Sequence, residues 1–387
     1  MKRNIIYFDN AATSWPKPEA TIQAVESCLR KTGGSPGRSG HSMSIDAGRV
    51  IFNAREAVAG LLGIDDPLRI VLTKNATEAL NIAAFGLLKS GDHVITSSME
   101  HNSVMRPLRA METSGIELTV LPCPATGEID PGVIVPAVKK NTKAIFMTHA
   151  SNVTGTIMSL IDIGRIAREH GLIFCVDAAQ TAGSLPIDIR TMNIDLLAFT
   201  GHKSLFGPQG TGGLYIREGL EQFIPPLMRG GTGSRSGYEE QPDFMPDKFE
   251  SGTLNTAGYA GLTAGINFIL SQGLSTISAH EKSLTELFLQ GIEAVDGVTI
   301  YGLRDTSRRI SIVSFNIRGV DPAKAALALD EKFGVMSRSG LHCAPSAHKT
   351  IGTYPAGTVR FSFSYFNTEE QIILSIEAIR KISQSRV

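Results

Sequence analysis

The stretch that decides the fold is Leu-Ala-Phe-Thr-Gly-His-Lys-Ser-Leu, residues 197–205. An apolar run ends there at Thr200 and is followed by a glycine, an imidazole and Lys203. A lysine at a strand end among apolar walls can have its amine pKa lowered enough to condense with an aldehyde. A surface lysine that closes a strand fits the same residues, so this stretch alone leaves both interpretations open.

A second apolar run, residues 172–176, ends at Asp177. A buried carboxylate is costly unless a cation or hydrogen-bond donors face it. The protonated ring nitrogen of pyridoxal phosphate (PLP) is such a cation, and an aspartate paired with it keeps the ring able to withdraw electrons. An aspartate that caps the following helix would also explain the Val-Asp-Ala-Ala sequence.

From Leu68 onward, short β-rich runs alternate with helical patterns. This alternation predicts a mostly parallel sheet covered by helices on both faces. The expected strands are 69–73, 93–96, 117–121, 144–148 and 172–177, and the expected helices are 77–88, 104–111 and 161–170. Ligands gather at the carboxyl ends of such strands, where both Asp177 and Lys203 fall.

Residues 223–255 are rich in glycine and proline and predict a long ordered loop. The expected elements after it are a helical pattern at 266–295, strands at 298–301, 310–316 and 359–363, and helices at 322–333 and 368–382. We therefore predict a large α/β domain over 16–260 and a small α+β domain over 261–387, with residues 1–15 packing near the small domain.

The charge balance is even, with 37 Lys and Arg against 37 Asp and Glu among 387 residues and a pI of about 7.1. No net field draws such a chain to nucleic acid or to an anionic membrane, so we expect a small-molecule substrate. The apolar stretches are too short for a signal peptide or for the roughly 18 residues of a membrane span. A cytoplasmic protein is expected.

Four cysteines, Cys28, Cys123, Cys175 and Cys343, lack C-x-x-C spacing. This argues against a disulfide framework and against a zinc site, so we predict reduced thiols and no bound metal. Cys28 and Cys175 lie in apolar patterns and are expected in the core, whereas Cys343 has a different setting.

Asp177-Ala178-Ala179-Gln180 followed by Thr200-Gly201-His202-Lys203 resembles the core signature of the class V aminotransferase family of PLP enzymes. Within that family the chain is most similar to Suf-like cysteine desulfurases and selenocysteine lyases, from Tyr7 to the region of Arg360. The resemblance implies a fold-type I PLP-dependent transferase. In that fold a large domain with a mostly parallel seven-stranded sheet is joined to a small α+β domain, and two chains form a homodimer.

The resemblance also implies roles at the cofactor. Lys203 would form the Schiff base and shuttle the substrate proton, and Asp177 would pair with the ring nitrogen. His101 would stack on the ring and relay protons as a further catalytic residue, and Gln180 would bond the phenolic oxygen of the ring. The further cofactor-binding residues implied are Ala76, Thr77, Thr200 and His202 at the phosphate, Asn152 near the ring and substrate, and Thr253 on the neighbouring subunit's phosphate. Residues 75–78 also open a predicted helix, whose N-terminus favours phosphate.

Residues 338–344, Arg-Ser-Gly-Leu-His-Cys-Ala, resemble the catalytic loop of the Suf-like desulfurases. This implies that Cys343 takes sulfur from L-cysteine as a persulfide and that alanine is released. Only the thiolate attacks, so the loop should keep Cys343 exposed and near positive charge. Arg360 matches the family's clamp for the substrate carboxylate, a task that suits a planar guanidinium. The predicted substrate-binding residues are Arg360, Asn152, Ala11, His41 and Arg338.

The sequence thus predicts a cysteine desulfurase of sulfur metabolism and iron–sulfur cluster assembly, with a sulfur-acceptor protein as a partner. A selenocysteine lyase or a cysteine sulfinate desulfinase is an open alternative. An aminotransferase or epimerase of the same family, or a non-catalytic PLP-domain partner, would fit the fold as well. The loop also departs from the family, since Pro345-Ser346 follows Cys-Ala where glutamine and proline are usual.

Overall fold

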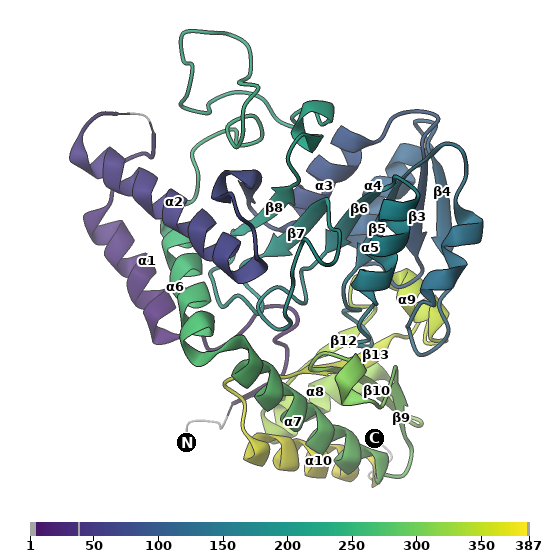
Figure 1. Ribbon diagram of the computed structural model, residues 1–387. Coiled ribbons are helices and arrows are strands. Elements are labelled where there is room, and N and C mark those ends of the chain that lie inside the picture. Colours follow the sequence, from purple (N-terminus) through teal and green to yellow (C-terminus); the bar gives the residue numbers. More distant parts are fainter. Residues whose placement is uncertain (1–4, 38, 385–387) are drawn as a thin grey trace.

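Seven strands form the central sheet of the protein, in the order β2-β8-β7-β6-β5-β3-β4. The computed structural model describes residues 5–37 and 39–384 (Figure 1). The strands are β2 (Ile70–Thr73), β3 (His93–Ser97), β4 (Glu117–Leu121), β5 (Thr142–Thr148), β6 (Ile173–Asp177), β7 (Leu196–Thr200) and β8 (Gly212–Ile216). β8 runs antiparallel to both of its neighbours and the other pairs are parallel, which confirms the predicted mostly parallel sheet.

Both faces of this sheet are buried. In β5, Ile145 and Met147 belong to one apolar core, whereas Ala144 and Phe146 belong to another. Successive side chains of a strand point to opposite faces, so each face needs its own helical cover. The helices of this unit are α1 (Glu19–Lys31), α2 (Ser42–Leu62), α3 (Ala76–Leu87), α4 (Asn102–Glu112), α5 (Leu160–Glu169) and α6 (Thr256–Gln272). Residues of α3 and α4 pack on one face, and residues of α2, α5 and α6 pack on the other.

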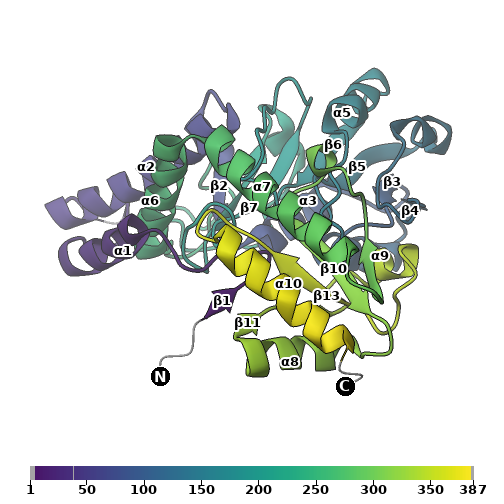
Figure 2. The same cartoon turned by 90° about the horizontal axis from the view of Figure 1, so that it is seen from below.

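The smaller unit lies below the large one in Figure 1 and is built on a four-stranded antiparallel sheet, in the order β12-β13-β10-β9. Its strands are β9 (Val298–Tyr301), β10 (Ile312–Ile317), β12 (Arg338–Gly340) and β13 (Thr358–Ser362), and its helices are α7 (Leu274–Glu293), α8 (Pro322–Phe333) and α10 (Glu369–Gln384). Figure 2 shows α7 and α10 lying side by side, in contact, beside this sheet. A core of packed phenylalanine rings, including Phe8, Phe288 and Phe361, holds the unit together.

The N-terminal segment joins the two units. β1 (Ile6–Tyr7) pairs in parallel with β11 (Val335–Met336) of the smaller unit. The carbonyl of His202, in the large unit, accepts hydrogen bonds from the Ser14 N–H at 3.0 Å and from the Lys17 amine at 2.8 Å. The predicted packing of residues 1–15 near the small domain can be followed from residue 5 onward, because residues 1–4 lie outside the described residues.

The prediction of one continuous helical pattern over 266–295 is wrong, because two separate helices meet in this stretch. Gly273, at φ +83°, ends α6, and α7 begins at the next residue. A glycine tolerates this backbone where other residues would be strained. α6 packs against α1 and α2, whereas α7 packs against α10, so the two helices belong to different units. The predicted domain boundary, between residues 260 and 261, falls inside α6, and we place the division at Gly273.

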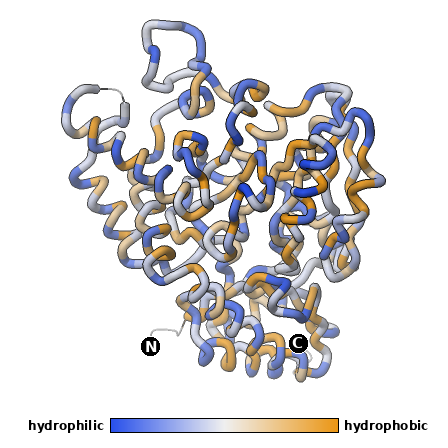
Figure 3. The backbone as a smooth tube through the Cα atoms, viewed as in Figure 1, coloured by the Kyte–Doolittle hydropathy of each residue, from blue (hydrophilic) through white to orange (hydrophobic). Residues whose placement is uncertain are grey.

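The predicted excursion at 223–255 is a long loop that projects at the top of Figure 1. Figure 3 shows polar residues along this loop and apolar residues concentrated in the interior. The short helices are α9 (Pro345–Thr350) and the 3-10 turns at Pro67–Arg69, Pro131–Val133, Val135–Ala137, Leu220–Phe223 and Thr306–Arg308. None of the helices within the described ranges has the length and apolar character needed to cross a membrane.

Candidate active site

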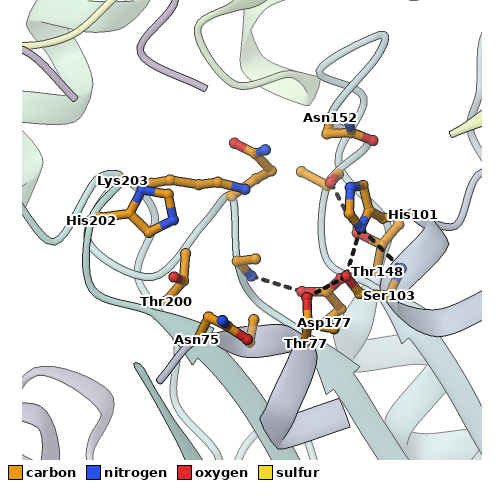
Figure 4. A pocket seen from close by; sticks show the side chains of 14 residues that line it. Asn75, Thr77, His101, Ser103, Thr148, Asn152, Asp177, Thr200, His202 and Lys203 are labelled. Carbon is orange, nitrogen blue, oxygen red and sulfur yellow. Dashed lines mark hydrogen bonds between the residues drawn. The ribbon is translucent and has the colours of Figure 1, made fainter. Parts of the chain in front are cut away.

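A pocket of about 270 Å³ opens where β5, β6 and β7 end (Figure 4). Thr148, Asp177 and Thr200 are the last residues of these three strands, and all of them line the pocket. The full lining consists of Asn75, Ala76, Thr77, His101, Ser103, Thr148, Ala150, Asn152, Asp177, Ala179, Gln180, Thr200, His202 and Lys203. Nine residues that the sequence predicts at the cofactor are therefore gathered in one cavity.

Lys203 lies in the turn after β7 and reaches across this pocket in Figure 4. Burial lowers the pKa of its amine to about 8, although the charge of Asp177 acts in the opposite direction. A larger fraction of this amine is therefore neutral at physiological pH than in an ordinary lysine. Only the neutral amine can attack an aldehyde, so the pocket favours imine formation at this residue.

Asp177 is 5% exposed and faces the same pocket. One carboxylate oxygen accepts the N–H of Ala179 at 2.9 Å, while burial raises the pKa of the group. The other oxygen has no hydrogen-bond partner among the described residues. A buried carboxylate with one free oxygen is suited to a cationic N–H of a ligand.

Several hydrogen-bond donors at the α3 end of the pocket have no partner among the described residues. Asn75 caps α3 by accepting the N–H of Glu78 at 2.9 Å, which leaves the first N–H groups of the helix, at Ala76 and Thr77, directed outward. Thr200 Oγ1 and His202 Nδ1 are buried without any hydrogen-bond partner among the described residues. Buried polar atoms are rarely left unpaired. These donors at a positive helix end fit a phosphate group.

His101 precedes α4 and borders the pocket. Its Nδ1 accepts the backbone N–H of Ser103 at 3.1 Å, so the neutral ring carries its proton on Nε2. Burial, reinforced by the charges of Lys203 and nearby arginines, lowers the pKa of His101 to about 3. The ring is therefore neutral at physiological pH.

Cys343 lies beside this pocket rather than in its lining. It is exposed and borders an adjoining open pocket of about 420 Å³ that also includes Thr77 and His101. The Arg338 guanidinium donates a hydrogen bond to the sulfur at 3.5 Å. The exposure and the nearby positive charge are the conditions under which a thiolate reacts.

The loop that carries Cys343 is held against the large unit. The Asn152 amide donates to the His342 carbonyl at 2.7 Å, and the N–H of Asn102 donates to the Cys343 carbonyl at 2.8 Å. His342 and Cys343 both adopt left-handed backbone, at φ 47° and 59°. Ala344 is part of the core of the large unit. The loop therefore contacts the large unit as well as the small one. The predicted domain division places it in the small domain alone.

Arg360, in β13, is 1% exposed and does not line the pocket directly. Its Nη1 donates to the carbonyl of Asn152 at 3.0 Å, and its Nη2 pairs with Asp9 at 2.9 Å. Its Nε is buried and has no partner among the described residues. The guanidinium is thus fixed through both of its terminal nitrogens, and the Nε–H is left without a partner.

Three predicted residues lie elsewhere. Ala11 lines a neighbouring small cavity, and its carbonyl accepts the Gln180 amide at 3.1 Å. His41 caps the N-terminus of α2, and Thr253 lines a separate pocket beside β2. Their proposed roles toward substrate and toward the neighbouring subunit remain predictions.

Four residues of the lining were not predicted at the site: Ser103, Thr148, Ala150 and Ala179. Asn75 was predicted only as part of the phosphate-binding stretch 75–78. Thr148 ends a predicted strand, so its position held a signal that could have been used. No local sequence pattern could predict that Asp9 pairs with Arg360, because the two residues are 351 positions apart in the sequence.

Comparison with known proteins covers almost the whole chain. The family profile described as "Aminotransferase class-V" matches residues 6–374. A "Probable cysteine desulfurase" of Methanothermobacter thermautotrophicus is 38% identical, covering 98% of this chain and 95% of the relative. Another of the same description, from Pyrococcus abyssi, is 34% identical, covering 100% of this chain and 96% of the relative.

Solved structures show the same similarity. The apo structure of cysteine desulfurase from Thermococcus onnurineus NA1 has a TM-score of 0.92 at 34% identity, covering 98% of this chain and 95% of that chain. The cysteine desulfurase CsdA from Escherichia coli has a TM-score of 0.87 at 29% identity, covering 98% of this chain and 94% of that chain.

Proposed function

The chain belongs to the aminotransferase class-V family, and we propose that it is a PLP-dependent cysteine desulfurase that moves the sulfur of L-cysteine onto Cys343 and releases L-alanine. The predicted family and the predicted fold-type I architecture are confirmed by these matches along the chain. The neighbours named cysteine desulfurase support this activity over an aminotransferase or epimerase.

One arrangement of three side chains carries the proposal. Lys203, whose amine pKa is lowered, and Asp177, which has one carboxylate oxygen without a hydrogen-bond partner, line the same pocket. The exposed Cys343 thiol lies beside that pocket. This chemistry requires three groups: an amine that forms an imine, a carboxylate that pairs with the ring cation, and a thiol that accepts sulfur.

The residues of the pocket fit PLP. Asp177 would hold the ring nitrogen with its free oxygen, and the unpaired donors of Thr200 and His202 would hold the phosphate beside the N-terminus of α3. When bound to Lys203, PLP supplies a ring that stabilises negative charge at the α-carbon of an amino acid.

Arg360 would bind the α-carboxylate of the substrate, and Lys203 would act at its α-carbon. The unpartnered Nε of Arg360 is a donor for the α-carboxylate, and Asp9 and Asn152 keep the guanidinium plane fixed. The Lys203 amine would take the α-proton of the substrate. His101, whose pKa is lowered by burial, would border the ring as a neutral imidazole.

Cys343 would take the sulfur. Its thiolate attacks the substrate sulfur, a new S–S bond forms, and the carbon–sulfur bond breaks with its electron pair left on carbon. That carbon is then protonated, alanine leaves, and a persulfide remains on Cys343. Arg338, whose guanidinium donates to the Cys343 sulfur, would hold that sulfur in position before attack.

We further propose a homodimer in which Thr253 reaches the phosphate of the neighbouring subunit. In this structure Thr253 lies away from the cofactor pocket of its own chain, as such an arrangement requires. Sedimentation of the PLP-loaded protein tests this proposal, and a loaded, active monomer would contradict it.

The test of the desulfurase proposal uses PLP-loaded protein and L-cysteine. Wild-type protein should show a yellow imine band that borohydride removes and should form alanine and sulfide in the presence of a reductant. Cys343→Ser should keep the band and lose alanine formation by at least about 100-fold. Cys28→Ser, at a buried thiol of α1, is the matched control and should keep both.

Two results would contradict the proposal in different ways. Absence of the imine band in all variants would exclude PLP chemistry at Lys203. Unchanged alanine formation by Cys343→Ser would exclude its role as sulfur acceptor.

A further inference from the structure

The turn that carries Lys203 is held by side chains of the N-terminal segment. This turn, residues 201–207, follows β7. Its backbone carbonyls at His202, Lys203 and Phe206 accept hydrogen bonds from side chains of residues 13–21. Phe206 has left-handed backbone, at φ 56°, a conformation that a bulky residue adopts only when its surroundings impose it. The placement of Lys203 therefore depends on residues that lie far from it in the sequence.

Lys17 is the charged member of this group of donors. Its amine donates to the His202 carbonyl at 2.8 Å and to the Ser14 hydroxyl oxygen at 2.7 Å. The side chain is half-buried, and burial lowers the pKa of the amine to about 8, so the amine is still mostly protonated at pH 7. An ammonium group donates hydrogen bonds and cannot accept them. Both contacts of Lys17 therefore have a fixed direction.

Ser14 carries this direction on to Lys203. Its hydroxyl oxygen lies 2.8 Å from the Lys203 carbonyl and 3.3 Å from the His202 carbonyl. A hydroxyl has one proton, and because Lys17 already donates to the oxygen, that proton points to a carbonyl. The shorter distance favours the carbonyl of Lys203. Lys17, Ser14 and Lys203 thus form a chain of hydrogen bonds in which each bond strengthens the next.

The segment that carries Lys17 is itself anchored. The N–H of Trp15 donates to Asn10 Oδ1 at 3.2 Å, and the Tyr7 hydroxyl donates to the carbonyl of Thr13 at 3.0 Å. A donor on a segment that is already ordered loses less conformational entropy when it binds its acceptor. Lys17 can therefore hold the turn against movement.

We propose that Lys17 is a positioning residue, which fixes the turn of Lys203 through Ser14 and the His202 carbonyl so that the Lys203 amine meets the cofactor aldehyde. This inference rests on the proposed function, because it concerns the imine at Lys203. Lys17 is absent from the lining of the cofactor pocket, so it acts through the backbone of the turn. An amine on a loosened turn samples more orientations, and fewer of them lead to reaction.

Hydrogen exchange of the full chain without PLP tests the hold on the turn. The Phe206 N–H donates to the same Lys203 carbonyl at 2.9 Å and so reports on this turn. Lys17→Met keeps a long side chain without the charge, and exchange of residues 203–207 should rise about tenfold. Lys31→Met is the matched control, because Lys31 is an exposed lysine of α1 outside the pocket lining. It should leave this exchange unchanged.

Stopped-flow absorbance at pH 7 tests the consequence for Lys203. Lys17→Met should form the imine with PLP about tenfold more slowly than the wild type, and Lys31→Met should match the wild type. Lys17→Arg keeps a cation that only donates, so it should recover the rate to within about threefold. Lys17→Gln has an amide oxygen that can accept from Ser14, which frees the direction of the hydroxyl. Its rate should stay low.

Ser14→Ala tests whether the two residues act as one chain. It should slow imine formation about as much as Lys17→Met does. The double variant should be no more than about twofold slower than the slower single variant, because each change breaks the same chain of hydrogen bonds. Should Lys17→Met fail to fold, Lys17→Gln and Ser14→Ala carry the same test.

Three results would overturn the proposal: unchanged exchange of the turn in Lys17→Met, equal imine rates in Lys17→Arg and Lys17→Gln, or additive effects of the changes at Ser14 and Lys17. A Lys17→Met protein that unfolds at a lower urea concentration but forms the imine at the wild-type rate would show that Lys17 serves only the fold. If the wild type forms no imine, the proposed function fails, whereas hydrogen exchange still decides whether Lys17 holds the turn.

Discussion

The side-chain amide of Asn152 donates a 2.7 Å hydrogen bond to the carbonyl of His342, the residue that precedes Cys343. The carbonyl of the same Asn152 accepts from Arg360 at 3.0 Å. One residue at the end of the large sheet therefore touches both the proposed carboxylate clamp and the proposed sulfur acceptor.

Asn152→Ala should loosen the cysteine loop. Left-handed backbone at His342 and Cys343 is unfavourable on its own and persists because neighbours hold it. Loss of one buried hydrogen bond, about 1 kcal/mol, should slow alanine formation from L-cysteine about five- to tenfold. Hydrogen exchange of residues 341–346 should rise at the same time.

Asn141→Ala is the control for that change, because the exposed Asn141 amide also donates to a carbonyl, that of Gly91, at 2.8 Å. It should leave exchange of the cysteine loop unchanged. Unaltered exchange of the loop in Asn152→Ala would show that other contacts hold it.

Arg360→Met should weaken both stability and substrate binding. It leaves Asp9 without its cation and removes the donor proposed for the substrate carboxylate. Because Asp9 is 22% exposed, the loss in the free energy of unfolding should be about 1–3 kcal/mol, less than for a fully buried pair. The KM for L-cysteine should rise at least tenfold.

The double variant Asp9→Asn with Arg360→Met separates these two effects. It removes the unpaired charge, so unfolding in urea should recover most of the lost stability. The KM should stay high. Recovery of the KM together with stability would mean that Arg360 serves the fold and does not bind substrate.

Imine formation at Lys203 should accelerate with pH and level off just above pH 8. The neutral amine is the nucleophile, and its fraction rises as the pH passes through the lowered pKa of about 8. An ordinary lysine would continue to accelerate to pH 10 or beyond. Stopped-flow absorbance after mixing cofactor-free protein with PLP checks this, and a midpoint near 10.5 would contradict a desolvated Lys203.

Glu281 should make the protein less stable as the pH rises from about 5 to 8. Burial in α7 raises its pKa from 4.5 to about 8, so between these values the folded state binds a proton that the unfolded state has released. Folding then takes up protons, and the free energy of unfolding falls with rising pH by up to a few kcal/mol.

Glu281→Gln should make this dependence less steep, while buried Glu100, whose pKa is also raised to about 8, keeps its own share. Glu286→Gln, at an exposed position of the same helix, should leave the slope unchanged. Urea unfolding at several pH values measures the slope. An identical slope in the two variants would mean that Glu281 is not the titrating group.

Local patterns predicted many elements closely. The strands at 117–121 and 298–301 and the helix at 322–333 have the predicted bounds, because alternation, apolar periodicity and an Asp-Pro start are local signals. The break at Gly273 was missed, since a single glycine inside a helical pattern is usually tolerated. α9 was missed because six residues hold too little periodicity to reveal a helix.

By itself, the sequence determined the alternating sheet, the strand ends that carry Asp177 and Lys203, and the family resemblance, since each depends on neighbours along the chain or on motif order. Only the tertiary structure decided which donors are left unpaired, how Asp9 and Asn152 hold Arg360, and where Cys343 lies relative to the cofactor pocket. These relationships join residues hundreds of positions apart, and their energies depend on burial and geometry, which exist only once the units have packed together.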